Sequence, residues 1–269
     1  MTPDKVMIKN SDAAFEAGTI LSSKTGAPVS FEELVADLNH VKVIYIGEKH
    51  TEQAHHDIQL KVIKSLFAKD PALSIGMEMF DRSYQAVLDD WFQSDLDEET
   101  FLKRSHWYAN WRYDFELYRG ILDFAKQEKL PLVALNLPFN IPSKIRVGGI
   151  DYLSEYERQF MPLEIDTTQP KHRAYAQQVF QAHHFSKKVD FENFYLAQCV
   201  WEDTMAESIA RSLGDDRMVV IVGNGHIQFK YGVPERAFNR TGASFRTIYL
   251  ARVGEAVALD VADYIWVTE

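Results

Sequence analysis

The stretch Val41-Lys-Val-Ile-Tyr-Ile-Gly-Glu-Lys-His-Thr-Glu-Gln-Ala-His-His56 decides the fold that we predict for this chain. It begins with a run of β-branched and apolar residues, which is typical of a strand buried on both faces. The run stops at Gly47, and Glu48 and His50 follow closely. Ligands of open α/β sheets bind at the carboxyl ends of the strands, so we expect the chemistry of the protein here.

Segments with helical and strand-like patterns alternate around this stretch. Ser30 and Glu33 have the spacing of a capping box, and apolar residues in 58–67 recur at helical spacing. Further strands are expected at residues 73–80, 131–136, 218–222, 244–250 and 264–267. This alternation predicts an α/β fold with a mainly parallel sheet flanked by helices on both faces.

Between residues 139 and 213 the strands stop and the pattern is helical. We expect three parts: an N-terminal arm at 1–29, an α/β domain at 30–138 and 214–269, and a smaller inserted helical lobe at 139–213. The last helix of the lobe should begin after the cap Asp190. Gln198 and Glu202 lie on its otherwise apolar face, either as hydrogen-bonded core groups or as members of a site.

The composition argues against several classes of protein. The chain has 269 residues, 46% of them hydrophobic and 25% charged, which is typical of a globular protein. A net charge of −10 argues against binding to nucleic acid, and no apolar run approaches the roughly 20 residues of a transmembrane helix. The single cysteine, Cys199, excludes an internal disulfide. The first residues lack the apolar segment of an export signal, although a chain trimmed of its signal would look the same.

Four of the expected strands end in polar residues that can carry chemistry. These are Glu48 and His50 after Gly47, Glu78, Asn136, and His226 after Gly223. Glu78 lies between apolar residues, and a buried carboxylate requires a cation, a metal ion or hydrogen-bond donors. Because parallel strands bring their carboxyl ends to one edge of a sheet, we expect these side chains to lie side by side.

These residue types suit two versions of one site. In the first, His50, Glu78 and His226 bind a divalent metal ion. In the second, the same residues and Glu48 act as catalytic acids and bases on water, and Asn136 holds the oxyanion of the substrate. A plainer interpretation is that each histidine is only a hydrogen-bonded loop residue.

Other histidines and aromatic residues have less specific patterns. We expect His55 and His56 to face solvent on the first turn of the crossover helix. The aromatic cluster of His106, Trp107, Trp111 and Tyr113 would either line a pocket for a flat ligand or form ordinary core.

The helical lobe contains candidate ligands for haem. Tyr175, His183 and His184 lie in or at the end of one expected helix, with lysines next to the histidines. Imidazole and phenolate are common ligands of ferric haem, and lysine or arginine suits its propionates. Alternatively, histidines and lysines at the end of a helix only complement its dipole.

Several short motifs occur in a fixed order between about residues 41 and 250. They are Ile46-Gly-Glu-Lys-His50, Gly76-Met-Glu78, Ala134-Leu-Asn-Leu-Pro138, His183-His184, Ala197-Gln198, Met205-Ala206 and Gly223-Asn-Gly-His-Ile227. Each motif is short, but as an ordered set they are specific. The set resembles that of the ChaN-like haem-binding proteins.

The resemblance implies an α/β sheet with a smaller helical lobe and a role in bacterial haem or iron uptake. It also implies a superfamily shared with erythromycin esterases and Tiki-type metalloproteases, whose hydrolytic members use positions that match His50, Glu78 and His226. The best-known member of the family is a surface lipoprotein whose dimer holds stacked haems ligated by tyrosine, with histidine assisting. The chain has no lipobox cysteine at its start, which departs from that pattern.

We therefore predict a protein that binds haem on its helical lobe, shared across a homodimer. Tyr175, His183 and His184 are the first candidate ligands, followed by Tyr152 and Tyr156. The alternative is a metal-dependent or acid/base hydrolase at the strand ends. The resemblance suggests a periplasmic or membrane-anchored protein if a signal was trimmed, and a cytoplasmic protein otherwise.

Overall fold

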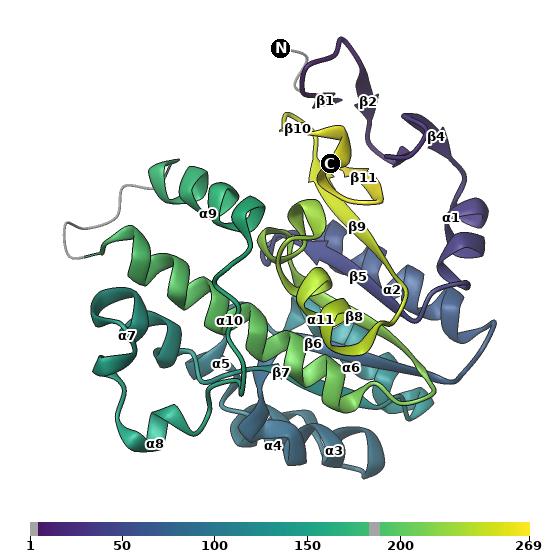
Figure 1. Ribbon diagram of the computed structural model, residues 1–269. Coiled ribbons are helices and arrows are strands. Elements are labelled where there is room, and N and C mark those ends of the chain that lie inside the picture. Colours follow the sequence, from purple (N-terminus) through teal and green to yellow (C-terminus); the bar gives the residue numbers. More distant parts are fainter. Residues whose placement is uncertain (1–4, 183–188) are drawn as a thin grey trace.

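The computed structural model describes residues 5–182 and 189–269, and its main sheet has eight strands within these residues (Figure 1). The strand order is β4-β3-β11-β9-β5-β8-β6-β7. Six neighbouring strands are parallel: β5 (Val43–Glu48), β6 (Leu73–Asp81), β7 (Leu132–Asn136), β8 (Arg217–Gly223), β9 (Phe245–Arg252) and β11 (Tyr264–Thr268). The expectation of a mainly parallel sheet is confirmed.

Helices cover both faces of this sheet (Figure 1). One face packs against α1 (Phe31–Leu38), α2 (Gln53–Phe67), α3 (Gln85–Gln93) and α6 (Glu116–Glu128), with α4 (Glu98–Arg104) and α5 (Trp107–Asn110) beside them. The other face packs against α10 (Phe191–Ser212) and α11 (Val233–Thr241). The first four residues of β5 are apolar because the strand is buried on both faces. Ile44 and Ile46 enter the first core, while Val43 and Tyr45 enter the second.

The N-terminal stretch belongs to two sheets. Strands β3 (Ile20–Ser22) and β4 (Ala27–Val29) form an antiparallel hairpin, and β3 pairs with β11 at the edge of the main sheet. Strands β1 (Lys5–Ile8) and β2 (Ala14–Glu16) form a small second sheet with β10 (Ala256–Val257). Ile20 and Leu21 are almost fully buried, so this stretch is tied to the α/β part by ordinary apolar packing.

The helices of the lobe gather beside the sheet (Figure 1). They are α7 (Asn140–Gly148), α8 (Glu155–Arg158) and α9 (Pro170–Ala182), and α10 runs from them onto the sheet. Ile141 and Ile145 of α7 pack against Ala197 and Val200 of α10 in a separate small core. In the described part of the chain, no helix combines the length and the apolar character needed to cross a membrane.

Short 3-10 helices join the larger elements. They are η1 (Arg82–Tyr84), η2 (Ile150–Tyr152), η3 (Asn224–His226), η4 (Gln228–Lys230) and η5 (Leu259–Val261). The loop after β8 comes very close to the end of β5, because a Cβ atom at Gly47 would lie only 2.1 Å from Oδ1 of Asn224. Glycine is therefore required at this position for the two strand ends to meet.

Candidate functional site

The carboxyl ends of three neighbouring strands form one polar cluster. Strand β8 lies between β5 and β6, so Glu48 and His50 from β5, Glu78 from β6 and His226 after β8 converge. All four side chains line a cavity of about 800 Å³. The structure thus brings together four of the five residues that the sequence placed at four strand ends, while Asn136 at the end of β7 does not line this cavity.

Glu48 and His50 form the first acid and base pair of the cluster. Nδ1 of His50 lies 2.7 Å from Oε1 of Glu48, which also accepts a hydrogen bond from the hydroxyl of Tyr118 at 2.6 Å. Gln59 donates to the other oxygen at 2.8 Å. Burial by itself would raise the pKa of Glu48, but the hydrogen bonds to His50 and His56 hold that pKa well below its usual range. Glu48 is therefore a buried carboxylate that orients His50.

His226 lies between two buried carboxylates. Its Nε2 atom is 3.4 Å from Oε1 of Glu78, and its Nδ1 atom is 3.3 Å from Oε1 of Glu202. The backbone N–H of Gly223 donates to the other oxygen of Glu78 at 2.6 Å. Burial by itself would lower the pKa of His226, but the charge of Glu78 and the hydrogen bonds to both carboxylates raise this pKa to about 10. At neutral pH this site holds an imidazolium ion.

The polar cluster continues into the lobe through residues that we did not predict. Glu202 is 1% exposed and lies 3.0 Å from Nε2 of His172 on α9. Arg236 of α11 contacts Glu202, Nδ1 of His172 at 3.1 Å, and the carboxylate of Asp203. These contacts pair Glu202 inside the protein and also join it to His226, so they agree with both interpretations left open for this residue. One helical turn separates His172 from Tyr175 and Ala176, a pattern that could have indicated an inward-facing histidine.

The free energy of unfolding is expected to fall as the pH rises from about 6.5 to about 10. The folded protein keeps the proton of His226, whereas the unfolded chain releases it above its ordinary pKa. The stabilisation is fully present below the ordinary pKa of histidine and is lost as the pH rises through the raised pKa of His226. Urea unfolding across this pH range checks the slope. His226→Gln should reduce this slope but not remove it, because His172 contributes in the same direction: burial by itself would lower its pKa, but the charge of Glu202 raises the pKa of His172 to about 9. The exposed His40→Gln should leave the slope unchanged, and equal slopes in all three proteins would contradict the prediction.

The expectation that His55 and His56 face solvent is wrong, since they are 0% and 2% exposed. The first turn of α2 packs under the loop that follows β5. Nδ1 of His55 accepts a hydrogen bond from the N–H of Lys49 at 2.9 Å, and its Nε2 lies 3.1 Å from Oγ1 of Thr268. Burial lowers the pKa of His55 to about 4, so this ring is neutral. Both histidines support the strand-end loop.

The aromatic cluster before α6 divides into two groups. Trp107 is core, at 1% exposure, whereas Trp111 and Tyr113 pack against the ring of His50 with centroids 4.7 Å and 5.1 Å away. Asn136 donates to the backbone carbonyl of Glu78 at 2.9 Å, and its Oδ1 accepts from the N–H of Leu137. Both polar atoms of this amide contact backbone, so its contact with a substrate stays a prediction.

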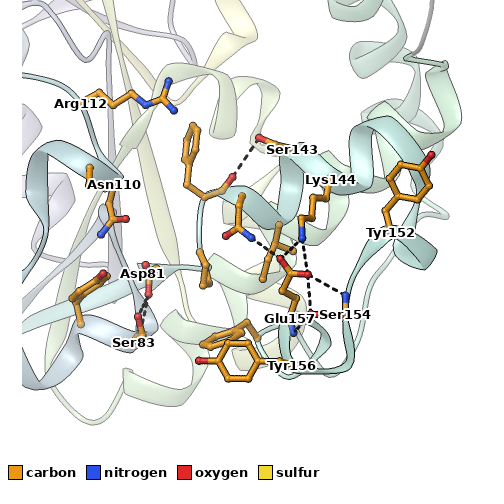
Figure 2. A pocket seen from close by; sticks show the side chains of 17 residues that line it. Asp81, Ser83, Asn110, Arg112, Ser143, Lys144, Tyr152, Ser154, Tyr156 and Glu157 are labelled. Atoms are coloured by element: carbon orange, nitrogen blue, oxygen red, sulfur yellow. Dashed lines mark hydrogen bonds and ion pairs between the residues drawn. The ribbon is translucent and has the colours of Figure 1, made fainter.

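The candidate haem ligands lie in different places. Tyr175 lines a cavity of about 190 Å³ together with His172, Trp201 and His226. Tyr152 and Tyr156 line a separate cavity of about 920 Å³, and Figure 2 shows them on the wall formed by the lobe. His183 and His184 lie outside the described residues. Within residues 5–182 and 189–269, no group of three or more His, Cys, Asp or Glu side chains is arranged to hold a metal ion.

The fold and the site define a class: a mainly parallel α/β sheet with a histidine and carboxylate cluster at its strand ends and a helical lobe beside it. The family described as haem-binding uptake, Tiki superfamily, ChaN, matches residues 34–237. The chain belongs to this family of haem-binding proteins, as the resemblance implied.

Two solved structures share the fold. ChaN of Campylobacter jejuni, described with cofacial haem binding, has a TM-score of 0.73 and 19% identity, over 92% of this chain and 95% of that one. The type III effector HopBA1 has a TM-score of 0.50 and 12% identity, over 88% and 91%. The chloroplastic protein RETICULATA-RELATED 5 of Arabidopsis thaliana is 22% identical over 85% of this chain. The chain spans about a third, 34%, of that relative's length.

Proposed function

We propose that this protein binds haem on its helical lobe, with the phenol of Tyr175 as the ligand of the iron. The observation that carries the proposal is the surroundings of Tyr175: the other lining residues of its cavity are mainly apolar, yet two imidazoles also reach it. Membership of the haem-binding family supports the proposal independently. Apolar walls with one oxygen or nitrogen ligand are what a haem site requires.

The residues around Tyr175 fit the chemistry of a ferric ligand. Ala176, Val179, Phe194 and Trp201 give the cavity apolar walls. Burial, and then the charge of Glu202, raise the pKa of Tyr175 to about 12, so the phenol is protonated when no cation is present. Ferric haem would supply the positive charge that stabilises the phenolate.

The size of the cavity indicates how haem would be held. Sites that enclose a small molecule usually measure about 300 to 1,000 Å³, and about 190 Å³ is too small for a whole macrocycle. Part of the ligand would therefore lie outside, toward Phe229, whose ring centroid is 5.9 Å from that of Tyr175. Lys171, one helical turn before Tyr175, lines the adjoining cavity of about 550 Å³ and suits a propionate. A second copy of the chain would cover the exposed face, which is our reason for proposing a homodimer. The description of the family as haem-binding uptake is our reason for proposing a role in haem uptake.

Titration of the purified protein with hemin tests the proposal. We expect a saturable change in the Soret absorption band and, by size-exclusion chromatography, a shift toward a dimer when hemin is added. An unchanged hemin spectrum would overturn haem binding, whereas a changed spectrum with a monomeric protein would overturn only the dimer.

A second candidate function, hydrolysis at the strand ends, is favoured by one specific observation. Two histidine and carboxylate pairs face the same cavity, and they meet at Gly223: a Cβ atom there would lie 3.1 Å from Cε1 of His50 and 3.6 Å from Oε2 of Glu78. A carboxylate and an imidazole on opposite sides of a substrate can remove and supply protons. In this candidate, His50 and Glu78 act on water and His226 holds Glu78 in its charged form. The other version of this site, with a divalent cation, has no support from the geometry, because His50, Glu78 and His226 are not arranged to hold a metal ion in the described part of the chain.

Glu78→Gln is expected to lower any esterase or peptidase activity by about 100-fold or more, because glutamine keeps the shape of the side chain but cannot accept a proton. Glu255→Gln is the control, since Glu255 lines the same cavity but pairs with Lys49 at 2.6 Å. A panel of ester and peptide substrates tests the acid/base version of the site, and metal analysis of untagged protein tests the version with a divalent cation. Equal activities of wild type and Glu78→Gln would contradict catalysis here.

A further inference from the structure

The cavity of about 920 Å³ is distinct from both sites described above, and it neighbours them through Phe139, whose ring packs against Trp201, a lining residue of both sites, with centroids 6.0 Å apart. It shares no lining residue with the strand-end cavity or with the cavity of Tyr175. One wall comes from the end of β6, η1 and the loop after α5, and the other comes from α7, η2 and α8 (Figure 2). Its volume is within the usual range for an enclosed small ligand, about 300 to 1,000 Å³.

A buried carboxylate lies at the first wall. Asp81 is 8% exposed, and its Oδ1 atom accepts hydrogen bonds from the backbone N–H of Ser83 at 2.9 Å and from the hydroxyl of Ser83. Its Oδ2 atom has no hydrogen-bond partner in residues 5–182 and 189–269, and it is not one of the fully buried atoms that lack a partner there, so it is open to solvent. Burial raises the pKa of Asp81, which is a sign of incomplete stabilisation by the protein. This oxygen therefore accepts hydrogen bonds from water, and the donor of a ligand in the cavity would take the place of that water.

Arg112 is on the same wall, and Figure 2 shows Asp81, Asn110 and Arg112 one above another there. Arg112 has a φ of 72°, an uncommon conformation for a residue other than glycine. Its guanidinium lies 5.6 Å from the centroid of Phe139, and the residue is exposed to solvent. This wall therefore offers both a strong acceptor and a strong donor.

The opposite wall is aromatic, and its charged side chains are paired with each other. Glu157 is already bound by Lys144 at 2.7 Å and by the amide of Asn140 at 2.6 Å, so this pair is internally neutral (Figure 2). Tyr152 and Tyr156 are 62% and 68% exposed, although large aromatic side chains usually avoid water. Together with the opposite charges of the first wall, this leaves a cavity lining without net charge.

We propose that this cavity binds a short, neutral oligosaccharide. A sugar ring has an apolar C–H face, which packs on an aromatic ring, and hydroxyl groups at its edge that donate and accept hydrogen bonds. Tyr152, Tyr156 and Phe139 supply the aromatic surfaces, Asp81 accepts from hydroxyls, and Arg112 donates to them. An anionic ligand such as haem is a poorer match, because the lining has no net positive charge to offset its carboxylates.

Calorimetric titration of the whole chain with short cello-, malto-, chito- and manno-oligosaccharides tests the proposal. We expect at least one to bind, and to bind about tenfold or more weakly to Asp81→Asn and to a Tyr152→Ala, Tyr156→Ala double variant. Asparagine keeps the hydrogen bond to the N–H of Ser83, and both tyrosines are exposed, so these variants should fold. Tyr108→Ala is the matched control, because Tyr108 is 57% exposed but does not line the cavity.

The proposal is overturned if no sugar of the panel binds, or if all variants bind a sugar as the wild type does. Parallel titration with hemin separates this cavity from the proposed haem site. Hemin binding should be unchanged in the double variant, and its loss there would assign the cavity to haem instead of to a sugar. Thermal unfolding of each variant checks that a loss of binding is not a loss of fold.

Discussion

Replacing Tyr175 with phenylalanine is expected to abolish the Soret shift caused by hemin, or to weaken hemin affinity by about 100-fold or more. Phenylalanine keeps the ring that packs near Phe229 and the apolar lining of the cavity, and removes only the phenol oxygen. A ligand bond to iron is lost while the shape of the site stays the same. The effect should therefore appear in the dissociation constant and in the spectrum, with little change in stability.

Three control variants give this prediction its specificity. Tyr152→Phe and Tyr156→Phe alter phenols in the other cavity of the lobe, and Tyr108→Phe alters an exposed phenol that lines none of the cavities of the lobe. All three should bind hemin like the wild type. If Tyr175→Phe binds normally and Tyr152→Phe or Tyr156→Phe does not, the haem site is in the larger cavity. His183→Ala and His184→Ala extend the test to the candidate ligands that lie outside the described residues.

Arg236→Met is expected to lower the free energy of unfolding by about 3–5 kcal/mol. Arg236 is 1% exposed and lies against Glu202 and Asp203, which are 1% and 0% exposed. Methionine fills similar space but leaves buried carboxylates without their main cation, and an uncompensated buried charge is costly. The melting temperature should fall by on the order of 10 °C.

Urea unfolding monitored by circular dichroism measures this change. Arg104→Met is the matched control, because Arg104 pairs with Asp90 at 2.6 Å on the surface, where both side chains are more than 40% exposed. Surface ion pairs contribute about 0–1 kcal/mol, so the control should be close to wild type. A loss below about 1 kcal/mol in Arg236→Met would show that the buried network contributes no stability.

The parallel sheet and its polar edge could be predicted because their causes are local. Continuous apolar strands such as Val43–Ile46 occur where helices cover both faces, and the structure confirms this arrangement. Once the strands are parallel, residues at their carboxyl ends must meet. That is why the positions of Glu48, Glu78 and His226 in the sequence were enough to predict that the three side chains lie close together.

The partners of these residues could not be predicted, because they come from distant elements. Tyr118 reaches Glu48 across 70 positions, and Gln59 reaches it from the crossover helix. Arg236 closes a network with His172 across 64 positions. Helical spacing shows which side of a helix is apolar, but it does not show which polar residue finds a partner inside the protein.

By itself, the sequence determined that this is an α/β protein of the ChaN family with histidines and acids at its strand ends. Strand type and glycine positions follow from backbone sterics and from apolar patterning within a few residues. Only the tertiary structure decided that His55 and His56 are buried supports, that His226 is held between Glu78 and Glu202, and that the lobe has two separate cavities. These features depend on how elements far apart in the chain pack, because packing sets both burial and the pKa of each buried group.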